Sequence, residues 1–208
     1  MNSVDKQRKI QHLYWRGGFG PGIRGWSFAP SDNPKAHIEQ IFRQSQDYKP
    51  LLITNQPAPS RVAFREMNPE ERQALLRESR QMIKTLNLQW LGQMVQSEAQ
   101  LREKMALFWH GHFACQSRAI FQAQSYLNTL RQHALGNFGE MVLAISKEPA
   151  MLQFLNNQQN HKQRPNENFA RELMELFTLG RGHYSEQDIK ESARAFTGWA
   201  FEGDRFVF

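Results

Sequence analysis

The 208-residue sequence has a single cysteine, Cys115, and no long apolar run. One cysteine excludes an intrachain disulfide and argues against a cysteine-based metal site. A lone thiol of this kind is far more often buried and inert than nucleophilic. No window approaches the ~18 apolar residues of a membrane span. Residues 1–9 are polar and lack the apolar segment of a secretory signal, so the cytoplasm is the default compartment.

The sequence also has no dense cluster of charges of one sign. The chain has a net charge of +6, and residues 1–66 hold most of it, with ten Lys and Arg against five Asp and Glu. Residues 67–208 hold 16 against 15. Nucleic-acid-binding proteins usually show a dense basic stripe or a known motif. Neither is present here, so the sequence predicts no nucleic-acid partner.

Helix start and stop signals, by contrast, recur along the whole chain. Apolar residues repeat at helical spacing, and asparagine, serine or proline precedes several of the repeats. The sequence therefore predicts a mostly α-helical fold, an irregular multi-helix bundle, in one domain over residues 1–208. Residues 1–66 would form basic helices and a loop, and residues 67–208 the main helical core. The expected helices cover residues 4–16, 34–46, 69–96, 98–112, 118–135, 138–146, 149–155, 165–180 and 186–197, and the alternation around Gly203-Asp204 predicts the start of a C-terminal β-hairpin.

The stretch from Pro165 to Gly180 has the signals of a complete helix. Pro165 fixes its own backbone at the start, and Asn166 can cap the first turn. Gly180 tolerates the left-handed conformation that ends many helices. An apolar stripe runs between these limits. The sequence therefore concentrates its carboxylates, amides and an arginine on one short helix.

The polar face of this helix has two interpretations. Glu167, Arg171 and Glu175 follow each other at four-residue spacing, which forms a ladder of surface ion pairs. Alternatively, Glu172 and Glu175 share a face at three-residue spacing, where two carboxylates can bind a hard metal or share a proton. The first interpretation is the commoner one for charged helices.

A histidine pair, His110 and His112, is the second group whose side chains could bind a metal or transfer a proton. Side chains two residues apart share a face on a strand but point about 200° apart on a helix, so one metal held by both requires the helix to end at Gly111. The simpler interpretation is that one ring packs in the core with a hydrogen-bonded neighbour. Alternatively, one histidine meets Glu172 or Glu175 across two helices, as in the metal sites of helix bundles. His183, just past the acidic helix, is a third candidate.

Seven stretches together resemble the bacterial domain-of-unknown-function family number 1800. They are His12-Leu13, Arg16–Gly20, Lys104–Phe113, Arg131–Phe138, Pro149–Leu152, Pro165–Gly180 and Tyr184–Trp199. The resemblance implies an uncharacterised protein of which this chain is the N-terminal portion, because the family pattern continues beyond Trp199 into a His-Asp motif. It also implies a partner protein, because genes of this family often lie beside a second uncharacterised family that resembles exported sulfatases.

Two functions are compatible with these residues. The first is a metal-assisted hydrolase with its site between residues 108–113 and 166–180. Its catalytic residues would be His110, Arg171, Glu172 and Glu175. A divalent metal would bind His110, His112 and Glu172, and substrate would bind Asn166 and Asn168 at the helix N-terminus.

The second is a non-catalytic helical scaffold that binds a partner protein. In that case the same polar groups fix the positions of the helices. Geometry separates the two functions. A hydrolase needs a histidine close to Glu172 or Glu175 in an open cleft, whereas a scaffold needs these groups paired with arginine or backbone.

Overall fold

The computed structural model of the chain describes residues 3–20 and 33–208, so part of the predicted basic region, residues 1–2 and 21–32, lies outside the described residues. The described part is mostly α-helical and ends in a two-stranded hairpin, as the sequence predicts. Its elements are α1 (Ser3–Gly17), α2 (Pro34–Gln44), α3 (Arg61–Glu66), α4 (Pro69–Gln96), α5 (Gln100–His112), α6 (Ile120–His133), α7 (Phe138–Ser146), α8 (Pro149–Phe154), η1 (Asn157–Gln159), α9 (Asn168–Glu172), η2 (Leu173–Thr178), α10 (Glu186–Ala195), β1 (Ala200–Glu202) and β2 (Arg205–Val207).

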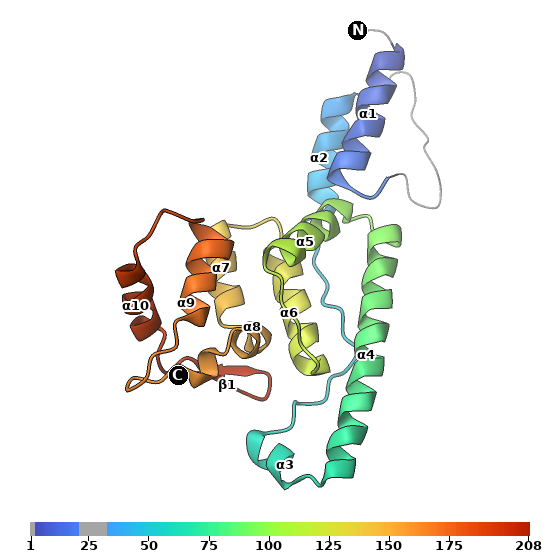
Figure 1. Cartoon of the computed structure of the whole chain (residues 1–208). Coiled ribbons are helices and arrows are strands. Elements are labelled where there is room, and N and C mark those ends of the chain that lie inside the picture. The colour runs from blue at the N-terminus through green and yellow to red at the C-terminus, as the bar shows by residue number, and fades with distance from the viewer. Residues whose placement is uncertain (1–2, 21–32) are drawn as a thin grey trace.

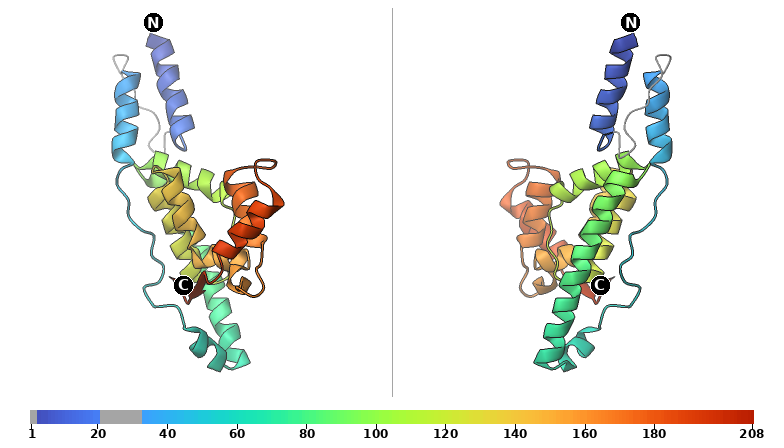
Figure 2. Two further views of the ribbon diagram at one scale, coloured as in Figure 1. Left: turned by 90° about the vertical axis from the view of Figure 1, so that its left-hand side faces the viewer. Right: turned by 90° about the vertical axis from the view of Figure 1, so that its right-hand side faces the viewer.

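Helices α1 and α2 lie side by side and project from one end of the molecule (Figures 1 and 2). Both contact α5, which joins them to the rest of the bundle. Helix α4 extends in the opposite direction, and the short α3 lies at its far end (Figure 1). No helix among the residues that the structure describes has the length and apolar character to cross a membrane.

Helix α4 begins with the signal that the sequence predicts. Asn68 accepts a hydrogen bond from the amide of Glu71, and the Glu71 carboxylate accepts one from the amide of Asn68, which forms a capping box. The helix then continues for 28 residues. Its inner face packs on α5 and α6 through a core cluster of Leu51, Leu86, Trp90, Met94, Ala106, Ile120, Leu127 and Ala134.

Helix α6 occupies the centre of the bundle and contacts α4, α5, α7 and α8. Its other side faces a second core cluster of Phe113, Tyr126, Leu130, Met141, Ile145, Ala150, Met151, Leu152, Leu155, Phe169 and Phe177. The antiparallel hairpin pairs Ala200 with Val207 and turns at Gly203-Asp204, as predicted, and β1 packs on α8. Gly203 has a positive φ of 61°, a conformation that favours glycine at such a turn.

The acidic helix differs from its prediction at its start and in its second half. It begins at Asn168, not at Pro165, because the Asn160 side chain holds the Asn166 amide and the Asn166 side chain accepts from the Asn168 amide. After Glu172 the chain widens into the π-helical η2. The Leu179 amide there donates to the Met174 carbonyl five residues back (2.8 Å). Such wide turns are rare and cannot be recognised from apolar spacing.

Candidate functional site

Arg171 is held in ion pairs within the acidic segment. Its two terminal nitrogens donate to the Glu186 carboxylate of α10 (2.9 and 2.7 Å). One of them also donates to Glu167, one turn earlier on the chain (3.1 Å). The predicted pair between Glu167 and Arg171 is therefore present, and Arg171 links α9 to α10. A guanidinium engaged by two carboxylates is not poised to hold an anionic substrate.

Glu175 is also fully engaged. Arg181 Nε donates to one carboxylate oxygen (2.5 Å), and the Tyr184 hydroxyl donates to the other (2.9 Å). The bond from Arg181, and then that from Tyr184, lowers the pKa of Glu175 below its usual range. Glu175, the third residue of the predicted ion-pair ladder, thus pairs with Arg181 rather than with Arg171. Glu172, the last residue of α9, is half-buried. Its carboxylate makes no hydrogen bond to any described residue.

The two histidines have separate environments on α5. His112 Nε2 donates to the Phe177 carbonyl of η2 (2.9 Å), and its ring packs edge-on against Trp109 and Phe113. His110 lies between the rings of Trp90 and Tyr126, with centroid distances of 5.5 and 6.3 Å. Burial lowers the pKa of His110 below its usual value, so the neutral imidazole is favoured.

The predicted metal ligands do not converge. In the part of the chain that the structure describes, no group of three or more His, Cys, Asp or Glu side chains is arranged to hold a metal ion. Nor does a hydrogen bond or ion pair join His110 or His112 to Glu172 or Glu175 within residues 3–20 and 33–208. Because α5 continues to His112, the helix does not end at Gly111 as shared metal binding requires. The set of His110, His112 and Glu172 is therefore not assembled.

The two asparagines predicted to bind substrate stabilise the local backbone. Asn166 Oδ1 accepts from the Asn168 amide (3.0 Å), and Asn168 Nδ2 donates to the Leu155 carbonyl after α8 (3.0 Å). These bonds fix the start of α9 against α8. His183 lies exposed in the turn before α10.

A buried ion pair that sequence reasoning missed lies between α5 and α6. Arg131 donates to both oxygens of Glu103 (2.7 and 2.9 Å), and these side chains are 3% and 2% exposed. Trp90 Nε1 of α4 donates to the same carboxylate (2.9 Å). The neighbouring Arg102 donates to the carbonyls of Ser45 and Arg131, near the C-terminal ends of α2 and α6. The signal in the sequence was the charged run Arg102-Glu103-Lys104, of which Arg102 and Glu103 are buried.

Glu148 is a second buried acid. One oxygen accepts from Ser125 and Thr129 of α6, whereas Oε2 is buried without a hydrogen-bond partner among the described residues. Burial, chiefly, raises the pKa of Glu148. Burial and the nearby Glu148 also raise the pKa of the Cys115 thiol to about 12, so this cysteine is inert, as the sequence analysis favoured.

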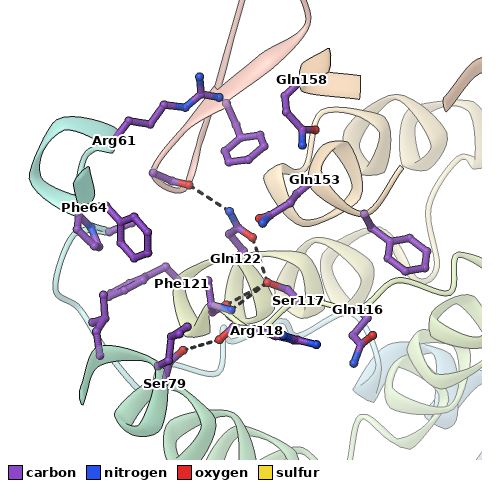
Figure 3. Close-up of a pocket in the computed structure, with 18 of the residues that line it drawn as sticks. Arg61, Phe64, Ser79, Gln116, Ser117, Arg118, Phe121, Gln122, Gln153 and Gln158 are labelled. Atoms are coloured by element: carbon purple, nitrogen blue, oxygen red, sulfur yellow. Dashed lines mark hydrogen bonds between the residues drawn. The ribbon is translucent and has the colours of Figure 1, made fainter. Parts of the chain in front are cut away.

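A hollow of a different kind lies away from all these residues, at the end of the bundle where α3 is found. It is a cleft of about 800 Å³ whose walls come from α3, α4, the segment before α6, α8 and the hairpin (Figure 3). Phe64, Leu75, Leu76, Phe121, Phe154 and Phe201 provide its apolar surface. Three hydrogen bonds fix the walls: Ser79 to the Arg118 carbonyl, the Ile120 amide to Ser79, and Ser117 to Gln122.

The charge in this cleft is of one sign. Among the described residues, Arg61, Arg65 and Arg118 are the only ionisable ones that line it, and none of them forms an ion pair with a described carboxylate. Arg61 extends from α3 toward the hairpin, where it lies over the Phe201 ring (Figure 3). The acidic side chains of the hairpin, Glu202 and Asp204, line an adjoining hollow of about 530 Å³, which shares Ala58, Phe121 and Gly203 with the cleft. Residues 58–65 and 116–122 carry no motif that points to this cleft.

Comparison with known proteins finds one family. The model of the family described as "Protein of unknown function (DUF1800)" matches residues 12–208. No curated protein and no solved structure matches the chain.

Proposed function

Because the chain belongs to the DUF1800 family of proteins of unknown function, which carries no assigned reaction, we propose a function from its geometry. The chain is a non-catalytic helical scaffold that binds a partner protein. The observation that carries this proposal is the internal pairing of the polar groups on α9, η2 and α5.

Each of these groups joins two structural elements. Arg171 connects α9 to α10 through Glu186, and His112 connects α5 to the Phe177 carbonyl of η2. Glu175 holds the turn that follows η2 through Arg181 and Tyr184. A catalytic acid or base must instead be within hydrogen-bond reach of the proton that it transfers. The metal-assisted hydrolase has less support, because His112 is engaged by the Phe177 carbonyl and no group of three potential ligands is arranged to hold a metal ion among the described residues.

The buried network in the opposite half of the bundle supports the same function. Glu103, Arg131 and Trp90 join α5, α6 and α4 through buried side chains. Satisfied polar networks of this kind rigidify a core and specify one arrangement of the helices. A scaffold benefits from this rigidity, because a preorganised surface loses less entropy when its partner binds.

Co-purification tests the proposal. The chain is expressed together with the product of the gene that lies beside its own, and the mixture is analysed by size-exclusion chromatography with light scattering. We expect a single complex whose mass equals the sum of the two chains in a fixed ratio. Separate elution of the two proteins would contradict the proposal.

Variants of the internal pairs provide the second arm. Arg171→Ala should lower Tm and expose the α10 amides to hydrogen exchange, because the link between α9 and α10 is lost. Glu172→Ala is the matched control, since Glu172 has no hydrogen bond to lose. If Arg171 were catalytic instead, Arg171→Ala should leave Tm nearly unchanged or raise it.

A further inference from the structure

We propose that the cleft between α3, α4, α6 and the hairpin binds an acidic peptide segment with aromatic or leucine side chains. This inference rests on the proposed scaffold function, because the segment belongs to the partner protein. The cleft shares no residue with the acidic helix or the histidine pair.

Charge complementarity selects an anionic occupant. Three arginines from two separated segments line the cleft, and no carboxylate of residues 3–20 or 33–208 lines it. Helix α6 begins at the same place, with no acidic residue in its first turn, and its first amide is already bound by the neutral Ser79 hydroxyl. The positive end of its dipole therefore adds to the arginines. Arginine's planar fork of donors matches a carboxylate better than the point charge of lysine does.

The apolar surface selects large side chains. Phe64, Leu76 and Phe154 line the cleft and stay 38%, 38% and 44% exposed. Burying such side chains stabilises a complex by about 25 cal/mol for each Å² removed from water. The lining also has the composition of a protein-interface core, which is rich in aromatic residues and arginine and poor in lysine and acids.

The glutamines favour a peptide over a compact metabolite. Gln116, Gln153 and Gln158 are distributed along the cleft (Figure 3). Amide groups spaced in this way offer donors and acceptors to the backbone of an extended peptide at several points.

Selection from a library of random twelve-residue peptides displayed on phage tests the inference, with the wild-type chain as bait. We expect the enriched peptides to combine Asp or Glu with Phe, Tyr, Trp or Leu. The Kd of a labelled enriched peptide is then measured by fluorescence polarisation. Replacing its acidic residues by Asn and Gln should weaken binding at least about tenfold, and so should high salt.

Variants assign the binding to the cleft. Arg118→Glu and Phe154→Ala should each raise the Kd about tenfold or more, because one reverses a lining charge and the other removes an exposed ring. Arg43→Glu makes the same charge change on α2, at the opposite end of the molecule (Figure 1), and should leave the Kd unchanged. Circular dichroism melts establish that all three variants are folded.

The outcomes separate this inference from the scaffold function. No enrichment, or enriched peptides without acidic residues, would overturn the inference, and so would a Kd that Arg118→Glu and Phe154→Ala leave unchanged. If the partner still forms a complex in those cases, the scaffold function stands and its docking surface lies elsewhere. If the acidic peptides bind the cleft but the neighbouring gene product forms no complex, that partner assignment fails and the cleft assignment remains.

Discussion

The Glu103–Arg131 pair allows a quantitative test of the buried network. Glu103→Gln keeps the size of the side chain and removes its charge. The Arg131 guanidinium, only 3% exposed, then remains in the core without a counter-charge. Removing one partner of a buried ion pair costs about 3–5 kcal/mol, because an uncompensated charge remains. We expect a loss of that size in the free energy of unfolding.

The double variant Glu103→Leu with Arg131→Leu distinguishes pair formation from simple loss of packing. It removes both charges but leaves Trp90 Nε1 and the Lys49 carbonyl without their partners. Each unsatisfied group costs about 1–3 kcal/mol. The double variant should therefore be much less destabilised than the sum of the two single leucine variants, with a coupling energy of about 2 kcal/mol or more.

Urea titration followed by tryptophan fluorescence measures these free energies, because Trp90 bonds directly to the pair. Glu191→Ala is the control, since its ion pair with Arg194 is exposed, and it should change stability by less than about 0.5 kcal/mol. A loss below about 1 kcal/mol in Glu103→Gln would refute the reasoning. Strict additivity in the double variant would refute it too.

Three further variants test other buried or paired groups. Because the pKa of Glu148 is raised, its favourable contribution to the free energy of unfolding is present below about pH 4.5 and is lost as pH rises through the folded-state pKa. Glu148→Gln should therefore be more stable than wild type at pH 7, and its free energy of unfolding should depend less on pH in urea titrations. The lowered pKa of Glu175 has the opposite sign: its contribution is present above about pH 4.5 and is lost as pH falls through the folded-state pKa. Glu175→Gln should therefore lower Tm at pH 7 and lower it less as the medium becomes more acidic than about pH 4.5, while Glu172→Gln leaves Tm unchanged. His112→Phe keeps an aromatic ring but leaves the Phe177 carbonyl unpaired, which should cost about 1–3 kcal/mol in the same titrations; an unchanged midpoint would show that this bond does not hold η2 on α5.

Helix boundaries were predictable where short-range chemistry determines them. Asn68 and Ser185 each form a capping box with the acid three residues later, and α4 and α10 begin where these signals place them. The start predicted near Glu98 is two residues early, because α5 begins at Gln100 and Ser97 Oγ accepts from the Ala99 amide before the helix. Capping signals that act over three or four residues can be recognised in the sequence. The hydrogen bond from the Ala99 amide that competes for the Ser97 hydroxyl cannot.

The ion-pair partners of the acidic helix could not all be predicted, because a sequence does not give the distances between helices. Helical spacing correctly placed Glu167 beside Arg171, but Arg171 also turns to Glu186 on another helix. Glu175 pairs with Arg181, because the wide turn of η2 changes which residues share a face. The prediction therefore failed at the point where the helix ceased to have 3.6 residues per turn.

The cleft and the acidic helix differ in how their residues relate to folding. On α9 and η2 the polar side chains bond to one another, so their presence is explained by the stability of the fold alone. Arg61, Arg65 and Arg118 bond to no carboxylate, and Phe64 and Phe154 remain partly open to water. Arg61 and Phe64 each make a cation–π contact, with Phe201 and Arg72, but no such contact or ion pair is seen for Arg65 or Arg118 among the described residues. Like charges repel and hydrated apolar surface adds no stability, so the fold alone does not account for this lining. Binding explains it better, and the arginine and phenylalanine variants of the cleft test that directly.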